Sequence, residues 1–432
     1  MKKSEQAVTF AIMRKGVKIS GEYLHISSGE LYQRLLSISC VRGPAFPETF
    51  TYELAPVSVA LFHDDSSMQK SVKSQLASYI LQKDPSTLVH ELDQPSGVVF
   101  DGCGLLHCIP WPKVGTVQNI CDSFTSTVSD KSNHSSVPLC VVCDSYDTVT
   151  TKDPEQKRRR CLQKPCPDID LSITTPVPSN KEAFLANKKD KQKLITLLGQ
   201  HLTHAGVDVR HAGDEGDAEV VIVQQALDFL STYGNNVHVF CEDTDVLVLL
   251  LYHTPPSGEV FMRTRQKTIS IKATKAVLGR ELCMCLPFAH AMSGCDTTSS
   301  LYSIGKIKFM KLLESSQQIP SDVLIFGDIS APTQEICDTG EKFVTLLYSG
   351  GSSATDLNQL RYLYAISPKF VSVERMPPTS RACYYHSLRV HFQVSTWHHL
   401  KTVLRKEDYG FINEGSSVVP VITDLPAAPP EL

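Results

Sequence analysis

The sequence predicts an α/β fold with a mainly parallel central sheet flanked by helices. From about residue 95 onward, short apolar runs alternate with helix-like segments, a pattern typical of parallel strands joined by crossover helices. Each apolar run also ends in acidic residues. Because ligands of such sheets bind outside the carboxyl ends of the strands, we expect these acids to gather on one edge of the sheet.

Four strands and two connecting helices are expected in this part of the chain. The strands are predicted over residues 97–100, 137–143, 206–211 and 237–241, and the helices over residues 188–204 and 218–233. The acids that follow the four strands are, in order, Asp101, then Asp144, then Asp214-Glu215-Gly216-Asp217, and last Glu242-Asp243-Thr244-Asp245. The last group is the most informative, since it places two carboxylates one residue apart at the exit of a buried strand.

At 432 residues, the chain is long enough for one large domain with appendages or for two to three domains. We expect an N-terminal extension over 1–94, an α/β domain over 95–320, a mainly helical C-terminal extension over 321–413 and a disordered tail over 414–432. A helix is expected within residues 66–82 and another within 375–400, where four histidines lack ligand spacing and are expected on a surface helix. The tail contains few large apolar groups, which is typical of disorder.

Composition excludes several classes of protein. Hydrophobic residues make up 42% of the chain and the formal net charge is −4, so a globular protein is expected, with or without a nucleic-acid partner. No apolar run is long enough for a membrane span, and the first residues lack a secretory segment. The 14 cysteines are scattered, several within apolar runs, so reduced thiols are expected in an intracellular protein, nuclear or cytoplasmic and not secreted.

Seven acids are candidate metal ligands. They are Asp101, Asp144, Glu215, Asp217, Asp243, Asp245 and Asp296. Taken singly, each could be a turn residue or a helix cap, but gathered together they would repel one another unless cations neutralised them. Mg²⁺ or Mn²⁺ prefers such oxygen ligands, and two ions roughly 3.5–4 Å apart serve phosphodiester hydrolysis. The joint pattern therefore predicts a two-metal site.

The segment Gly294-Cys295-Asp296, followed by Ser303-Ile304-Gly305, carries a family resemblance. It resembles the helix–two-turn–helix element of the flap-endonuclease (XPG-type, PIN-like) nucleases, where Gly-Ser-Asp leads into Gly-Ile-Gly. Glu242 to Asp245 resembles that family's Glu-Asp-x-Asp, and the resemblance extends in order over about residues 95–320. The chain looks still closer to PIN-like proteins of animal mobile-element-type reading frames, which share its Asp-Thr-Asp-Val, His-Ala-x-x-Gly-Cys-Asp-Thr-Thr-Ser and Pro-Pro-Thr segments.

The resemblance implies a structure-selective nuclease that acts on DNA or RNA with two Mg²⁺ or Mn²⁺ ions. It assigns Lys152 and Arg159 to the scissile phosphate, and it implies a K⁺ site at the turn before Lys306. Two departures bear on these expectations. The chain carries residues 1–94 before the first acid, and Ser303 replaces a glycine of the turn.

Basic residues are the candidates for holding nucleic-acid phosphates. One cluster lies between Asp144 and Glu215 and contains Lys157, Arg158 and Arg160. The second lies at the Ile-Gly-Lys turn, where Lys306, Lys308 and Lys311 are joined by the backbone amide of Gly305. The first cluster could equally be a solvated loop or a nuclear-import tract. Two other functions stay open: a catalytically silent nucleic-acid-binding module, and a protein–protein scaffold. The sequence does not indicate an oligomeric state.

Overall fold

The computed structural model describes most of the chain. The described residues are 17–19, 22–24, 28–42, 47–131, 137–145, 151, 166–213, 217–234, 236–315, 318–349, 354–367, 372–400, 404–415 and 417–430.

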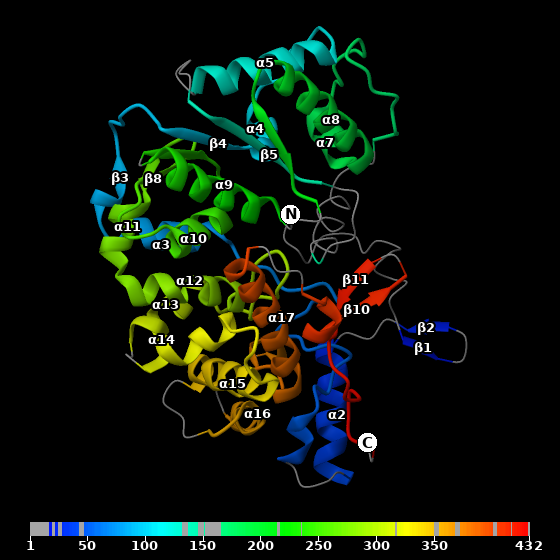
Figure 1. Cartoon of the computed structure of the whole chain (residues 1–432). Helices are drawn as coiled ribbons and strands as arrows, with labels where there is room; N and C mark the ends of the chain where they lie inside the picture. The colour runs from blue at the N-terminus through cyan, green and yellow to red at the C-terminus, as the bar shows by residue number, and fades with distance from the viewer. Residues whose placement is uncertain are drawn as a thin grey trace.

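A seven-stranded sheet organises the fold, in the order β3-β9-β8-β7-β4-β5-β6 (Figure 1). The strands are β3 (Leu88–Val89), β4 (Gly97–Asp101), β5 (Leu139–Cys143), β6 (Asp208–His211), β7 (Val237–Phe240), β8 (Val260–Arg263) and β9 (Thr268–Ser270). Strands β4, β5, β6, β7 and β8 all run parallel to one another. At one edge, β9 pairs antiparallel with β8, and β3 pairs antiparallel with β9. The predicted α/β class and all four predicted strands are confirmed.

The strand order reverses at β4. The chain proceeds from β4 to β5 and β6 on one side, then returns to β7 and β8 on the other. In the register, Phe100 of β4 lies opposite Val141 of β5 and Phe240 of β7, so the three strands end at the same edge. Such a reversal leaves a crevice outside the carboxyl ends of the two central strands, where α/β proteins bind ligands.

Helices cover both faces of the sheet, as its apolar strands require. Alternate residues of β4 face opposite ways: Val98 and Phe100 join one core, and Val99 joins the other. The first core is completed by α4 (Gly102–Cys108), α5 (Val117–Lys131), α7 (Lys181–Ala186) and α8 (Lys188–His204). The second includes α9 (Ala218–Tyr233) and α10 (Thr244–His253). Figure 1 shows α5 and α8 on one side of the sheet and α9 on the other.

The second core continues without interruption into a helical assembly. Its members are α3 (Ser74–Leu81), α11 (Ile271–Leu278), α12 (Arg280–Met292), α13 (Lys306–Glu314), α14 (Gln318–Val323), α15 (Thr333–Ser349), α16 (Leu357–Ala365) and α17 (Ser380–His398). This core contains residues from Tyr32 to Trp397. The boundaries expected at 94 and 320 therefore do not separate independent cores.

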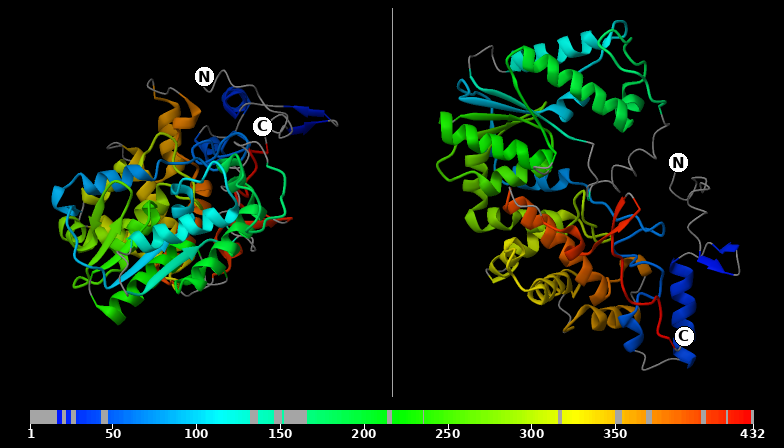
Figure 2. Two further views of the ribbon diagram at one scale, coloured as in Figure 1. Left: turned by 90° about the horizontal axis from the view of Figure 1, so that it is seen from above. Right: turned by 45° about the vertical axis from the view of Figure 1, so that its right-hand side comes forward.

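Short elements complete the described part of the chain. They are β1 (Val17–Ile19), β2 (Glu22–Leu24), α2 (Ser28–Arg42), η2 (Glu48–Thr51), η3 (Pro85–Thr87), η4 (Leu324–Gly327), η5 (Val373–Arg375), η6 (Lys406–Tyr409), β10 (Phe411–Glu414) and β11 (Ser417–Pro420). In the right view of Figure 2, α2 (blue) lies near the red C-terminal segment, at the end of the molecule away from the sheet. No helix among the described residues is long and apolar enough to cross a membrane.

Two expectations about the C-terminal part are wrong. Helix α17 is central and not superficial, because it packs against α12 and α15, and its His386 and His391 are buried. The segment expected to be a disordered tail is built into the fold. Strand β11 pairs with β10, Asp424 forms an ion pair with Arg381, and the carbonyl of Ala427 accepts the Leu54 N–H at 2.8 Å. Backbone pairing and these distant partners order a segment whose composition alone predicts disorder.

Candidate acidic site at the carboxyl edge of the sheet

Asp101, the last residue of β4, also caps helix α4. Its carboxylate accepts the Gly104 N–H at 2.8 Å, which satisfies a backbone donor that the first helical turn cannot pair. Burial raises the pKa of Asp101 above its ordinary value, the Gly104 N–H opposes that shift, and the neighbouring Asp144 carboxylate adds to it. The Asp144 carboxylate after β5 is therefore close enough to Asp101 to affect its pKa.

Asp243 and Asp245 follow β7 at the start of α10. Asp243 caps the helix by accepting the Asp245 N–H at 3.0 Å, whereas Asp245 is 1% exposed. Burial raises the pKa of Asp243 to about 6, and the Asp245 carboxylate adds to the rise. The thiol of Cys241 joins the two strand ends, since it donates to Asp101 Oδ2 at 3.4 Å and accepts the Asp243 N–H at 3.3 Å.

Asp296 lies on the loop between α12 and α13, which approaches itself closely. Gly294 has a φ of 97°, and a Cβ there would lie 2.7 Å from the Ser300 nitrogen, so only glycine fits. Ser303 has a φ of 59°, a conformation that side chains disfavour. This is the position at which the resembled family carries the first glycine of its turn.

Lys306 stabilises this loop from the inside. Its ammonium donates to the carbonyls of His290 at 3.1 Å and Gly294 at 2.7 Å, and to the Ser293 hydroxyl at 3.0 Å. The residue is 1% exposed, and burial lowers the pKa of Lys306 to about 7. The expectation that Lys306 contacts a nucleic-acid phosphate is corrected by this burial, because the lysine folds back under the loop.

Lys73, from the segment before α3, lies between the three acids of this half of the site. Its Nζ is 2.8 Å from Asp245 Oδ2, 3.1 Å from Asp296 Oδ1 and 3.9 Å from Asp243 Oδ1. Burial alone would lower the pKa of Lys73, but the carboxylates, led by Asp245, raise it well above its usual value. The ammonium is therefore charged, and it occupies the position between the carboxylates.

His290 holds the remaining oxygen of Asp245. Its Nε2 lies 2.7 Å from Asp245 Oδ1, and the imidazole is fully buried on α12. Burial, with help from the nearby Lys306 ammonium, lowers the pKa of His290 to about 4, so the neutral ring donates its Nε2–H. Although burial opposes it, Lys73 and then His290 hold the pKa of Asp245 well below its usual range. Both oxygens of Asp245 thus already accept protein donors.

Sequence reasoning missed both Lys73 and His290 as site residues. Residues before about 90 carried no recognisable chemistry, and a lysine ahead of a helix is an ordinary surface residue. His290 stands in the His-Ala-x-x-Gly-Cys-Asp segment that supports the family resemblance, and this was the one available signal. Lys73 offered none, because the acid it contacts lies 172 residues away.

Of the other predicted site residues, some are described by the structure and some are not. Asp217 caps α9 without a side-chain capping bond, while Gly305, Lys308 and Lys311 are exposed at and beyond the start of α13. Six predicted residues lie outside the described part of the chain: Glu215, Lys152, Arg159, Lys157, Arg158 and Arg160.

Among the described residues, no group of three or more His, Cys, Asp or Glu side chains is arranged to hold one metal ion. The reason in the Asp243, Asp245 and Asp296 half is physical, since the three carboxylates enclose the Lys73 ammonium. Their chemistry fits a cation, and the cation that they hold is part of the chain. The Asp101 and Asp144 half offers two carboxylates that interact with each other and fits a divalent ion if further ligands join them.

A cavity of about 220 Å³ opens beside Asp101. Phe240 forms one wall, with Lys131 Nζ 5.2 Å and Arg263 Cζ 4.5 Å from its ring centre. Neither cation forms an ion pair with a carboxylate of the described residues, and burial lowers the pKa of Arg263. Half-buried cations that line a cavity suit an anionic ligand such as a phosphate.

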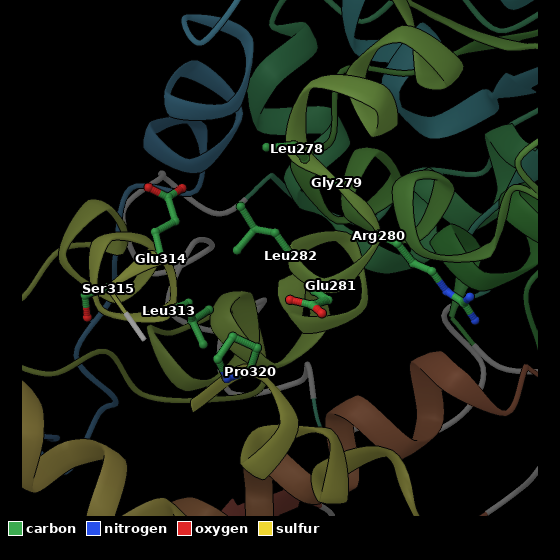
Figure 3. Close-up of a pocket in the computed structure, with 9 residues that line it drawn as sticks. All are labelled: Leu278, Gly279, Arg280, Glu281, Leu282, Leu313, Glu314, Ser315 and Pro320. Atoms are coloured by element: carbon green, nitrogen blue, oxygen red, sulfur yellow. The ribbon is translucent and has the colours of Figure 1, made fainter. Parts of the chain in front are cut away.

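A larger cavity, of about 560 Å³, lies elsewhere, between α12 and the α13–α14 turn. Figure 3 shows Leu282, Leu313 and Pro320 around it, with Arg280 directed away. None of the acids of the site lines it. Two carboxylates line it, Glu281 and Glu314, and Glu314 is paired with Lys83 at 2.9 Å.

Comparison with known proteins gives structural similarity only. No family model matches the chain, and no curated protein matches it. Among solved structures, the bacteriophage T5 D15 protein co-crystallised with metal ions is 12% identical, with a TM-score of 0.37 over 71% of this chain and 99% of that one. The catalytic core of Rad2 in complex with a DNA substrate is 13% identical, with a TM-score of 0.33 over 51% and 62%. Similarity at this level identifies no family, so function is inferred from the residues of this chain.

Proposed function

We propose that this protein is a metal-dependent nuclease that hydrolyses phosphodiester bonds of DNA or RNA. One observation carries the proposal: Asp243, Asp245 and Asp296, from the start of α10 and the α12–α13 loop, surround one cation, and the Cys241 thiol links Asp101 at the end of β4 to Asp243. Acids so close together stabilise positive charge, which hydrolysis of a phosphate diester requires.

Each half of the site is proposed to provide one cation position. Asp101 and Asp144, with Glu215 and Asp217, are proposed to hold a divalent cation. Asp243, Asp245 and Asp296 would supply the second cation position. When bound, Mg²⁺ or Mn²⁺ activates water and stabilises the leaving oxygen. Within the chain, His290 fixes the orientation of Asp245, and the Cys241 thiol keeps the ends of β4 and β7 in register.

Basic groups are proposed to position the nucleic acid. Lys152 and Arg159 would stabilise the scissile phosphate, and Lys157, Arg158 and Arg160, which are close to Arg159 in the sequence, would hold further phosphates. The exposed Gly305, Lys308 and Lys311 are proposed to contact a duplex phosphate, since a helix N-terminus and lysines favour such a ligand. The cavity flanked by Lys131 and Arg263 would take a nucleotide of the same substrate.

The finer family assignment belongs to the same proposal. Helices α12 and α13 are joined by a loop with two positive-φ residues, Gly294 and Ser303, which supports a helix–two-turn–helix element and, with it, K⁺ binding at the turn. The motifs shared with PIN-like proteins of animal mobile elements support descent from such a reading frame and an intracellular, nuclear or cytoplasmic, site of action.

Cleavage assays test the proposal directly. Purified protein is incubated with Mg²⁺ or Mn²⁺ and labelled flap, nicked and single-stranded DNA, and with RNA. We expect cleavage that a chelator abolishes and that Asp101→Asn lowers by more than about 100-fold, because even partners of metal ligands are typically worth 10–100-fold. Equal cleavage by the variant would identify a contaminating nuclease, and absence of cleavage on every substrate would contradict the enzyme assignment.

A catalytically silent nucleic-acid-binding module is the second candidate. It is favoured by Lys73, whose ammonium already neutralises part of the acidic site. Binding of the same oligonucleotides without cleavage, unchanged by Asp101→Asn, would support this module and exclude the nuclease.

A further inference from the structure

We infer that Lys73 permanently replaces one of the two divalent cations, so that the protein binds a single Mg²⁺ or Mn²⁺ ion. This inference rests on the proposed function and assigns a role within the same site. The bound ion would lie in the Asp101 and Asp144 half, and the ammonium of Lys73 would supply the positive charge between Asp243, Asp245 and Asp296. The chain thereby carries a catalytic charge that no chelator removes.

The contacts of Lys73 are those of an ion in a ligand shell. The ammonium contacts three carboxylates, of which the nearest two lie 2.8 and 3.1 Å away. Both oxygens of Asp245 are used, one by Lys73 and the other by His290. A divalent ion placed here would have to displace the lysine and would also face the Lys306 ammonium beneath the loop.

The segment that carries Lys73 is anchored on both sides. Before it, Lys70 donates to the Asp296 carbonyl at 3.1 Å and Ser71 donates to the Gly294 carbonyl at 2.7 Å. After it, α3 buries Leu76 and Ile80 in the core. The backbone of residue 73 is therefore fixed to the loop that carries Asp296, and the ammonium cannot leave the site by movement of the segment as a whole.

The two halves differ in the way their carboxylates are satisfied. Asp101 accepts a backbone N–H and a thiol, which are neutral donors. Asp245 accepts the Lys73 ammonium at 2.8 Å. A divalent ion that bound Asp101 would therefore displace no ammonium from that carboxylate, whereas one that bound Asp245 would have to displace Lys73.

Calorimetric titration with Mn²⁺ tests the inference on three proteins. We expect one bound ion for the wild-type chain, two for Lys73→Met and one for Lys83→Met. Lys83 is the matched control because it belongs to the same part of the chain but pairs with Glu314 away from the acids. The dependence of cleavage on Mn²⁺ should likewise change from first order in the wild type to cooperative in Lys73→Met.

The outcomes separate this inference from the proposed function. Two ions bound by the wild type, or no additional ion in Lys73→Met, would overturn the replacement while leaving a metal-dependent nuclease intact. No ion bound by the wild type would overturn both. If Lys73→Met does not fold, Asp296→Asn serves instead: the inference requires an unchanged single ion, and loss of that ion would contradict it.

Discussion

The two halves of the acidic site contain the same kind of residue but neutralise it differently. At the ends of β4 and β5, burial and the Asp144 carboxylate raise the pKa of Asp101, while the cations Lys131 and Arg263 line the cavity beside Asp101. At the start of α10, Asp245 is held by the ammonium of Lys73. The first half therefore borders a cavity that a ligand can enter. In the second half, a lysine of the chain itself neutralises the carboxylates.

The largest expected effect is a difference in protein stability between substitutions in the two halves of the site. Asp245→Asn should lower the free energy of unfolding by about 3 kcal/mol, because it removes the buried partner of the half-buried Lys73 ammonium. Asp101→Asn should lower it by less than about 1 kcal/mol, since Asn caps a helix as well as Asp does. Urea denaturation of the metal-free proteins measures both. Equal losses would show that the halves are not stabilised differently.

The cations of the first half should matter for binding. Arg263→Met keeps contact with Phe240 but removes the charge. We expect about a tenfold loss of affinity for single-stranded oligonucleotides, equivalent to roughly 1.4 kcal/mol and close to one charged hydrogen bond, and a weaker dependence on salt. Fluorescence anisotropy at two salt concentrations measures this. Arg405→Met is the control, because the Arg405 side chain is 81% exposed and lies 3.9 Å from Asp408. A similar loss of affinity in both variants would show that the cavity does not bind the oligonucleotide.

Ser303→Gly tests whether the backbone of the loop that carries Asp296 is strained. With φ at 59°, Ser303 is strained, and glycine relieves that strain. We expect a gain of about 0.5–1 kcal/mol in the free energy of unfolding. Ser315→Gly at the other end of α13, where φ is −81°, should instead be destabilising. A loss of stability in Ser303→Gly would mean that the hydroxyl contributes more than the backbone costs.

The smallest expected effect depends on pH. The pKa of Asp243 is raised to about 6 in the folded protein, so the folded state binds this proton more tightly than the unfolded state does. Asp243 therefore makes the fold less stable as the pH rises from about 4 to about 6. The side chain is 42% exposed, and solvent screening limits the effect to less than about 1 kcal/mol.

Comparison with Asp243→Asn isolates this contribution from the buried histidines, whose titration acts in the opposite direction. Asn retains the helix cap but cannot titrate. Relative to wild type, the variant should gain stability between pH 4 and pH 7 in urea denaturation of the metal-free proteins. A difference that does not change with pH would show that Asp243 keeps its ordinary pKa.

The parts of the fold that the sequence predicts well are those set by local periodicity. The predicted helices over 188–204 and 218–233 coincide with α8 and α9, and the four apolar runs form β4 to β7. Their apolar positions repeat with the period of one element, so neighbours in sequence suffice to identify them. The acids at the strand ends follow from the same parallel topology.

Contacts between distant segments are the parts that could not be predicted. The sequence of α17 is polar, yet its His386, Arg389 and His391 are buried by segments far away in the chain. The tail is ordered by Arg381 and Leu54. Lys306 looked like a phosphate ligand because its sequence position, after an Ile-Gly turn, says nothing about the direction of its side chain.

The sequence by itself determined four strands of the sheet and the helices over 188–204 and 218–233, because each depends on residue types at short spacing. It also predicts acids at the ends of those strands. Only the tertiary structure decided what neutralises those acids. Lys73 reaches Asp245 across 172 residues of chain, and nothing in its local sequence distinguishes it from a solvated lysine. The function of the Lys73 ammonium depends on the carboxylates around it. Those carboxylates surround Lys73 only after the core that holds α3 against the α12–α13 loop has formed.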